Sequence, residues 1–238
     1  MYARDIKVMP SDVSADGRIK LRSLLDYFQD TAGMAVEAIE GTATELYSRG
    51  YAWVVARYEI NFTGNMPMLD ETFTLRTYHD PNHGYNTLRM FETDFATAKT
   101  SWLLADVRSG RPVKPLAHIP GITARDNQEI SPDFMEIPPL SAITHTEIFP
   151  VRYHDADYNG HANNAAYFEW IYDMSPAEMS ARPLKTVCAS FRSGARLGET
   201  ITLEAQSDVE RNILLYEVKR QSSPSTKKPS ARFLCEWR

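Results

Sequence analysis

A short polar stretch in the second half of the chain holds the side chains best suited to acid–base chemistry. Residues 155–164 read DADYNGHANN, with two carboxylates, one imidazole and three side-chain amides directly before the apolar run AAYFEWIYD. Asp157 and His161 could supply a base, or a base and its partner, and Asn159 could orient a water or a carbonyl. Asp, Asn and Gly are also common turn formers, so each residue taken singly would equally suit a structural turn.

The same stretch has the features of a helix start. Gly160 permits a tight turn, and Asn163 is a plausible N-cap for a helix that begins at Asn164. The first backbone N–H groups of a helix have no intrahelical partner and lie at the positive end of its dipole. We therefore expect the backbone N–H of Asn164 to be placed where it could stabilise a developing oxyanion on an acyl carbonyl.

An internal repeat gives this stretch a counterpart. Residues 8–30 align without a gap to residues 151–173, and both segments carry apolar residues at helical spacing. Further along, LDETFTL at 69–75 matches LGETITL at 197–203, and each segment is a turn entering an alternating strand. Two matches in the same order predict that the chain arose by duplication.

The two copies differ where the polar side chains lie. The positions of Asp157, Asn159 and His161 are occupied in the first copy by Ser14, Asp16 and Arg18. The glycine turn and the helix are kept in both copies, but the set of acid, amide and imidazole is present only in the second. A turn with a purely structural role should look alike in both places. The difference therefore predicts chemistry in the C-terminal copy and a catalytically silent, supporting N-terminal copy.

Each copy reads as a short strand, a polar turn, one long helix and several strands joined by short turns. Short turns favour antiparallel pairing, and a helix lying across an antiparallel sheet is an α+β fold. Strands are expected at 52–63, 71–79, 86–96 and 100–108, and again at 185–192, 199–208, 211–220 and 230–237. The proline-containing stretch between the copies predicts a linker. The expected organisation is an N-terminal domain at 1–120, a linker at 121–146 and a C-terminal domain at 147–238.

Composition narrows the class of protein. The 238 residues are 43% apolar and 24% charged with a formal net charge of −5, so no basic surface for nucleic acid is indicated. No apolar run reaches the roughly 18 residues of a membrane span. Cys188 and Cys235 form no paired motif, and the N-terminus lacks a signal-peptide core, which favours a reducing cytoplasm. No metal or other cofactor is expected.

With these residues in view, the chain resembles the acyl-acyl-carrier-protein thioesterases of the double hot-dog fold. The resemblance rests on DADYNGHANNAAYFEW and on four further segments in the order that this family shows. They are DGRIKLRSLLDYFQDTAG, GYAWVVARYEI, SWLLADVRSGRPVKP and GETITLE. The ordered set is specific, whereas the DxDxxGHxNN string alone is shared with acyl-CoA thioesterases.

The resemblance implies two tandem hot-dog domains, each an antiparallel sheet wrapped around a long helix, forming an internal pseudo-dimer. It implies hydrolysis of fatty acyl-acyl carrier protein in fatty acid biosynthesis, with release of the free fatty acid. The catalytic positions of the family fall on Asp157, Asn159 and His161. A glutamate that the family has after the helix falls on Ser193 or Gly194, which leaves Asp157 or His161 to activate water without it. Plant members carry a transit peptide, and none is seen here, which suggests a bacterial cytoplasmic protein.

Binding residues are also implied. The acyl chain would be bound in the N-terminal domain, and the residues expected to line its tunnel are Leu25, Phe28, Trp53 and Val55. Acyl carrier proteins are acidic, so a basic patch would help docking. The residues expected to form that patch are Arg182, Lys185, Arg192 and Arg196. No nucleic acid or membrane partner is expected, and the protein would be a monomer or homodimer.

Other functions stay open at this stage. The nearest alternative is an acyl-CoA thioesterase, followed by a hot-dog dehydratase or a protein that binds acyl thioesters without hydrolysing them. The HDPNH segment, His79 to His83, has zinc-like spacing but is expected to be a hairpin loop. Cys188 lies between apolar neighbours and is expected to be a buried residue rather than a nucleophile. The polar segment 222–230 is expected to be an exposed hairpin loop.

Overall fold

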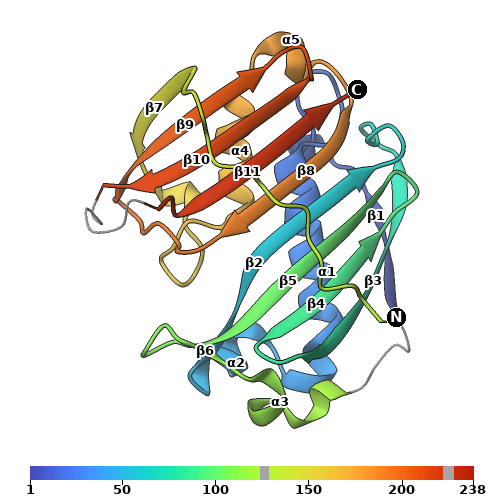
Figure 1. Ribbon diagram of the computed structural model, residues 1–238. Helices are drawn as coiled ribbons and strands as arrows, with labels where there is room; N and C mark the ends of the chain where they lie inside the picture. Colours follow the sequence, from blue (N-terminus) through green and yellow to red (C-terminus); the bar gives the residue numbers. More distant parts are fainter. Residues whose placement is uncertain (124–128, 222–227) are drawn as a thin grey trace. The chain divides into compact units, whose positions relative to one another are not determined.

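The computed structural model describes residues 1–123, 129–221 and 228–238, and its chain divides into two compact units (Figure 1). Unit 1 comprises Met1–Phe134 and unit 2 comprises Met135–Arg238. The division falls inside the segment predicted as a linker. Among the described residues, no helix is long and apolar enough to cross a membrane. The predicted hairpin loop at 222–230 lies for the most part outside the described residues.

Unit 1 is an antiparallel sheet with one long helix across a face. Its strands are β1 (Tyr2–Lys7), β2 (Tyr51–Phe62), β3 (Thr72–His83), β4 (Asn86–Glu92), β5 (Ala96–Asp106) and the short β6 (Pro112–Val113). Its helices are α1 (Leu21–Glu40), α2 (Ala43–Ser48) and α3 (Pro115–His118), with 3₁₀ turns at Pro10–Asp12 and Pro120–Thr123. The strand order is β1-β3-β4-β5-β2, with β6 paired to β5.

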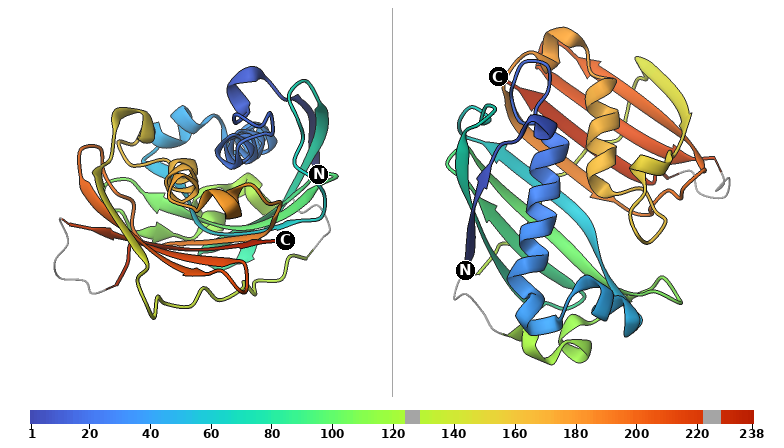
Figure 2. Two further views of the ribbon diagram at one scale, coloured as in Figure 1. Left: turned by 90° about the horizontal axis from the view of Figure 1, so that it is seen from above. Right: turned by 180° about the vertical axis from the view of Figure 1, so that it is seen from behind.

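The core of unit 1 lies between α1 and this sheet (Figure 2). Leu24, Leu25 and Phe28 recur at helical spacing and are fully buried beneath the helix. The ring of Phe28 stacks on Phe91 of β4 with the ring centroids 4.7 Å apart. The helix ends at Gly41, whose φ of 83° lies in the left-handed region that favours glycine.

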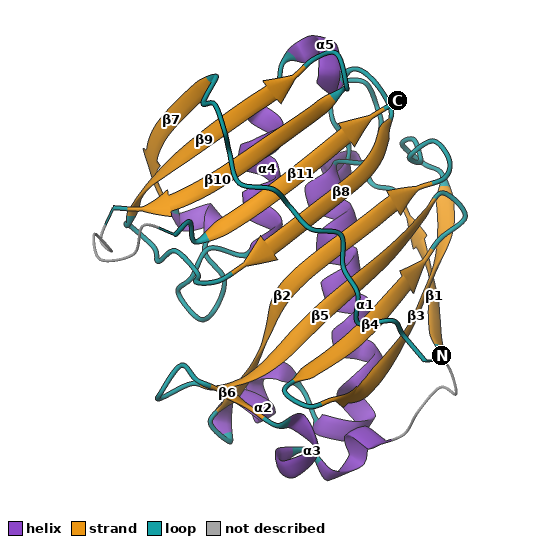
Figure 3. Cartoon of the chain, in the orientation of Figure 1, coloured by secondary structure: helices purple, strands orange, loops and turns teal. Residues whose placement is uncertain are grey.

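Unit 2 repeats the arrangement with a shorter helix (Figure 3). Its strands are β7 (His145–Pro150), β8 (Leu184–Phe191), β9 (Thr200–Asp208), β10 (Ile213–Arg220) and β11 (Ala231–Trp237), in the order β8-β11-β10-β9-β7. Its helices are α4 (Asn164–Asp173) and α5 (Ala177–Ser180), with a 3₁₀ turn at Tyr153–Asp155. Tyr167 and Phe168 of α4 pack against Phe191 and Phe233 of the sheet.

The strands predicted from alternating hydrophobicity are all present, although some bounds differ; the strand expected at 100–108, for example, is β5, which begins at Ala96. The expected loop at His79–His83 is wrong, because β3 continues to His83 and pairs with β4 through a bulge. Within it the side chain of Asp80 is buried and accepts a hydrogen bond from His83 at 3.0 Å. The strand expected at 86–96 ends at Glu92, because the N–H of Thr93 donates to the carbonyl of Ala96 and closes a tight turn.

The predicted repeat is confirmed by the backbone. An isolated bridge joins Arg18 to Met68 in unit 1, and the equivalent bridge joins His161 to Arg196 in unit 2. The matching backbone bonds agree closely, since Lys20 donates to Asp12 at 2.7 Å and Asn163 donates to Asp155 at 2.7 Å. Gly17 and Gly160, at equivalent positions, have φ values of 81° and 72°. The duplication therefore extends from the sequence to the geometry of the turn that precedes each helix.

The segment between the copies covers apolar side chains on the sheet face away from the helix in each unit. In unit 1, Ile130 and Phe134 pack with Tyr78, Leu88 and Met90. In unit 2, Ile137 and Leu140 pack with Cys188, Leu215 and Leu234. The prediction that Cys188 is buried is confirmed, since 1% of it is exposed.

Candidate functional site

Asp157 organises the turn in which the candidate site is built. Its Oδ1 accepts the backbone N–H of Asn159 at 2.8 Å and of His161 at 3.3 Å. Its own N–H donates to the carbonyl of His161 at 2.8 Å, and the N–H of Gly160 donates to the Asp157 carbonyl at 3.0 Å. The carboxylate therefore fixes the backbone on either side of the imidazole.

The imidazole of His161 is half-buried and faces the loop that follows β8. Gly194 lies against the ring, and a Cβ built on this glycine would be 3.3 Å from Cδ2 of His161. Neither ring nitrogen of His161 hydrogen bonds to another of the described residues. The ring is thus held by its backbone and by packing, with no side-chain hydrogen bond to another described residue.

Asn159 presents one unused polar atom. Its Nδ2 lies 3.5 Å from Oδ2 of Asp157, the carboxylate oxygen that does not hold the turn. Its Oδ1 is buried and has no hydrogen-bond partner among the described residues. A buried amide oxygen without a partner carries a desolvation cost that a bound water or substrate group would remove.

The start of α4 supplies a backbone donor. The predicted N-cap is confirmed, because Oδ1 of Asn163 accepts the N–H of Ala165 at 2.9 Å. The N–H of Asn164, the first residue of the helix, meets no acceptor among the described residues. This group lies at the positive end of the helix dipole, where a negative charge is favoured.

In the equivalent turn of unit 1, the polar side chains bind to one another. Oδ1 of Asp16 accepts the hydroxyl of Ser14 at 2.6 Å and the N–H of Arg18 at 3.1 Å. The hydroxyl of Ser14 lowers the pKa of Asp16 below its ordinary value, with further help from Arg18. The side chain of Arg18 points back to the same carboxylate at 3.5 Å. The side chains of Ser14, Asp16 and Arg18 bind within this turn, which contains no imidazole, so the two copies differ in structure as they do in sequence.

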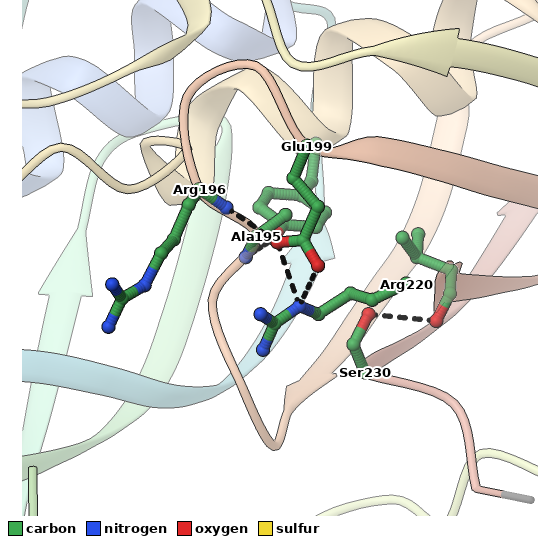
Figure 4. A network of polar contacts seen from close by, with 7 residues as sticks. Ala195, Arg196, Glu199, Arg220 and Ser230 are labelled. Carbon is green, nitrogen blue, oxygen red and sulfur yellow. Dashed lines mark hydrogen bonds and ion pairs between the residues drawn. The ribbon is translucent and has the colours of Figure 1, made fainter. Parts of the chain in front are cut away.

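The loop 192–199, whose residues Ala195, Arg196 and Glu199 are drawn in Figure 4, lies against the turn that carries His161. The N–H of Ala162 donates to the carbonyl of Ala195 at 2.8 Å, and the N–H of Leu197 donates to the carbonyl of Gly160 at 3.1 Å. Position 194, where the family glutamate was expected, therefore neighbours His161 and carries no carboxylate. The carboxylate of Glu199 in the same loop forms an ion pair with Arg220.

The residues expected to line an acyl tunnel are part of the packed interior of unit 1. Leu25, Phe28 and Val55 are at most 1% exposed. Trp53 packs at the opposite end of the helix, against the cluster of Leu46, Leu104, Ile119 and Ile122. Contact with an acyl chain stays a prediction for all four.

The residues expected to form a basic patch lie in two groups. Arg182 and Lys185 stand at the start of β8, where they bind Asn212 and Glu236 respectively. Arg192 and Arg196 follow the end of the strand beside His161 and are exposed. Lys185 and Arg192 are seven residues apart along an extended strand, or about 23 Å, so the four do not form one patch. The four residues are close in the sequence, but the two ends of an extended strand lie far apart in space.

Two residues of the site were not predicted. Tyr167 accepts the N–H of Ala195 at 3.0 Å through its hydroxyl oxygen, and Arg220 binds Glu199. The repeat held a signal for Tyr167, because its counterpart in the first copy is Leu24. Arg220 lies far along the chain, and only the pairing of β9 with β10 brings it to the loop. Within the described residues, no group of three or more His, Cys, Asp or Glu side chains could hold a metal.

Sequence comparison finds two domain families on this chain. The acyl-ACP thioesterase N-terminal domain matches residues 1–115, and the acyl-ACP thioesterase C-terminal domain matches residues 141–238. A chloroplastic acyl-[acyl-carrier-protein] hydrolase, FATB2 of Cuphea viscosissima, is 22% identical over 214 residues, which cover 75% of this chain and 48% of that protein. The chloroplastic palmitoyl-acyl carrier protein thioesterase of Arabidopsis thaliana is 20% identical over 224 residues, covering 81% and 52%. The chain thus spans about half the length of the curated relatives it matches.

Solved structures share the fold over the whole chain. An acyl-ACP thioesterase from Bacteroides thetaiotaomicron has a TM-score of 0.80 at 19% identity, covering 100% of this chain and 97% of that one. The 12:0-ACP thioesterase from Umbellularia californica has a TM-score of 0.84 at 16% identity, covering 100% and 96%. The likeness confirms the predicted fold of two tandem hot-dog domains.

Proposed function

We propose that this chain, which belongs to the acyl-ACP thioesterase family, hydrolyses the thioester between a fatty acyl chain and acyl carrier protein. The observation that carries the proposal is the turn at the start of α4. It carries the imidazole of His161 and, three residues further on, the backbone N–H of Asn164, neither of them bound to another described residue. Its counterpart in unit 1 has no imidazole, and the carboxylate there, Asp16, is bound by Ser14 and Arg18. A base and an oxyanion donor are the two elements that thioester hydrolysis needs.

In the proposed reaction, the thioester carbonyl oxygen accepts the N–H of Asn164. His161 takes a proton from a water molecule as its oxygen bonds to the carbonyl carbon, and the carbonyl becomes an oxyanion. The oxyanion then reforms the carbonyl as the carbon–sulfur bond breaks, and the sulfur takes the proton back from His161. The products are a fatty acid and the free thiol of the carrier, so atoms and charge balance.

Asp157 and Asn159 support this chemistry in different ways. The carboxylate of Asp157 is bonded to the backbone N–H of His161 and supplies a negative charge that stabilises the imidazolium formed in the reaction. The amide oxygen of Asn159, buried without a protein partner, would orient the attacking water. These assignments follow the sequence prediction and agree with the hydrogen bonds of the turn.

The test is turnover on matched acyl thioesters of acyl carrier protein and of CoA, read as free thiol and as free fatty acid. Release of both products supports hydrolysis. A dehydratase would change a hydroxyacyl substrate without releasing thiol, and a protein that only binds would release neither product. Release from CoA alone would assign the chain to the acyl-CoA thioesterases instead.

Recognition of the carrier protein is proposed for the exposed Arg192 and Arg196, which lie beside the turn. Charges on the rim of an interface act mainly on the association rate and its salt dependence. Reversing both charges should lower kcat/KM for the acyl carrier protein substrate more than for the CoA substrate. The matched control reverses Arg182 and Lys185, at the far end of β8, and should leave that ratio unchanged.

The N-terminal domain is proposed to bind the acyl chain, as the resemblance implied. Support comes from the depth of its apolar core under α1, where Leu25 and Phe28 are fully buried. Replacing Phe28 by Leu should change the ranking of kcat/KM across acyl chain lengths while kcat on the best substrate stays similar. A cytoplasmic location and a monomeric or homodimeric state stay predictions.

A further inference from the structure

We infer that Arg220, Glu199 and Tyr167 are positioning residues that hold the loop 192–199 against His161. The inference rests on the proposed function, in which His161 is the reacting group. None of the three was picked out by the sequence motif, and each acts through the loop rather than on the substrate.

The loop packs against the imidazole of His161. Gly194 lies in contact distance of the His161 ring, and the carbonyl of Ala195 accepts the N–H of Ala162, the next residue after His161. A shift of this loop would therefore move both Gly194, which packs beside the ring, and the backbone next to His161. Displacement of a catalytic group by about 1 Å can cost about 100-fold in rate.

Two sets of contacts hold the loop, and Figure 4 shows the one at Glu199. The carboxylate of Glu199 accepts the N–H of Arg196 at 3.0 Å and binds Nε of Arg220 at 2.8 and 2.9 Å. Its side chain is 9% exposed, so this ion pair is largely shielded from water. At the other end, the hydroxyl oxygen of the buried Tyr167 accepts the N–H of Ala195 at 3.0 Å.

Comparison with the first copy shows which of these contacts are present only in unit 2. There Glu71 accepts the N–H of Met68 at 2.8 Å, just as Glu199 accepts that of Arg196, so the carboxylate cap is common to both copies. Glu71 forms no ion pair with another described residue, and the counterpart of Tyr167 is Leu24. The hot-dog turn therefore forms without the arginine and the tyrosine. They occur in the copy that carries the imidazole, which points to a role in the site rather than in the fold.

The test compares Arg220→Met with Arg232→Met. Arg232 donates to Glu217 at 2.8 Å across β10 and β11, and Glu217 is also 9% exposed, so each variant leaves one shielded carboxylate without its arginine. Both variants should lose a similar amount of thermal stability. Strand alternation places Glu217 and Arg220 on opposite faces of the sheet, so only Arg220→Met loosens the loop.

We expect Arg220→Met to lower kcat by about tenfold or more, with KM within about twofold, because the substrate is not touched. Hydrogen exchange at the amides of Ala162 and Ala195 should accelerate about tenfold relative to Arg232→Met. Adding Glu199→Gln to Arg220→Met should cause little further loss of kcat, because the two act as a unit. Arg220→Lys, which keeps the charge, should restore part of the activity.

Equal kcat for Arg220→Met and Arg232→Met would overturn the inference. So would a loss of kcat without faster exchange at Ala162, since the arginine would then act directly on the substrate. The exchange measurement needs no substrate. If the wild-type protein releases no thiol, the proposed function fails, and exchange at Ala162 and Ala195 still decides whether Arg220 holds the loop.

Discussion

Replacing Asp157 by asparagine separates the charge of this residue from its part in the turn. Asparagine has nearly the same shape and keeps an oxygen that can accept the N–H groups of Asn159 and His161. Alanine removes both the charge and the acceptor. If the carboxylate stabilises the protonated His161, both variants lose turnover. If it only holds the turn, the asparagine variant stays active.

The expected magnitudes follow from the hydrogen bonds. Asp157→Ala leaves two backbone N–H groups without their acceptor at 2.8 and 3.3 Å, and bonds to a charged group contribute about 1.5–3 kcal/mol each. Because the turn is only half-buried, we expect a loss of about 2–4 kcal/mol of unfolding free energy for alanine. For asparagine the loss should be about 1 kcal/mol. Turnover should fall about 10²–10⁴-fold in both, which is about 3–5 kcal/mol of activation free energy.

The assay is thiol release from an acyl carrier protein thioester, alongside urea unfolding of each variant. His161→Ala should lose a similar factor in turnover, and Asn159→Ala about 10–100-fold. Asp16 holds the equivalent turn of unit 1, so Asp16→Asn and Asp16→Ala are the matched controls. They should change stability and leave turnover within about threefold, as should Arg18→Ala. Turnover of Asp157→Asn within about threefold of wild type would refute the role of its charge.

Three further outcomes are expected. Gly194→Glu places a carboxylate beside His161 at the family position, and its Cβ requires the ring to move by only a few tenths of an ångström. This variant should have a higher kcat than Gly194→Gln, which has the same shape without the charge. Equal kcat for the two variants would remove any role for the charge. Burial raises the pKa of Tyr167 from 10.0 to about 12, so its stabilising effect is complete below pH 10 and lost between pH 10 and 12. Over that window the stability advantage of wild type over Tyr167→Phe should shrink by about 2–3 kcal/mol in urea unfolding, and a constant difference would contradict the shift. The kcat/KM advantage of acyl carrier protein over CoA should shrink as salt rises from about 0.05 to 0.5 M, and equal values at low salt would favour the acyl-CoA assignment.

Local sequence patterns were enough to place the long helix of each copy, most of the strands and the turn of the candidate site, but not the short helices α2, α3 and α5. Alternating apolar residues predict strands, and the spacing of Leu24, Leu25 and Phe28 predicts the helical face, because both signals depend on neighbours in the chain. The N-cap at Asn163 was likewise predictable, since a cap is a contact over two residues. The repeat added a comparison within one molecule, which distinguished the polar turn of unit 2 from its structural counterpart.

Contacts between distant parts of the chain were decided only by the tertiary structure. Arg220 reaches Glu199 because β9 and β10 pair in one register, and a shift by one residue would turn its side chain to the other face. Gly194 meets the ring of His161 because two loops lie side by side, which neither loop encodes alone. The four basic residues near β8 looked like one cluster along the chain, yet an extended strand separates them into two groups. Sequence alone therefore determined the local chemistry of the turn, while long-range strand pairing decided which residues surround and hold it.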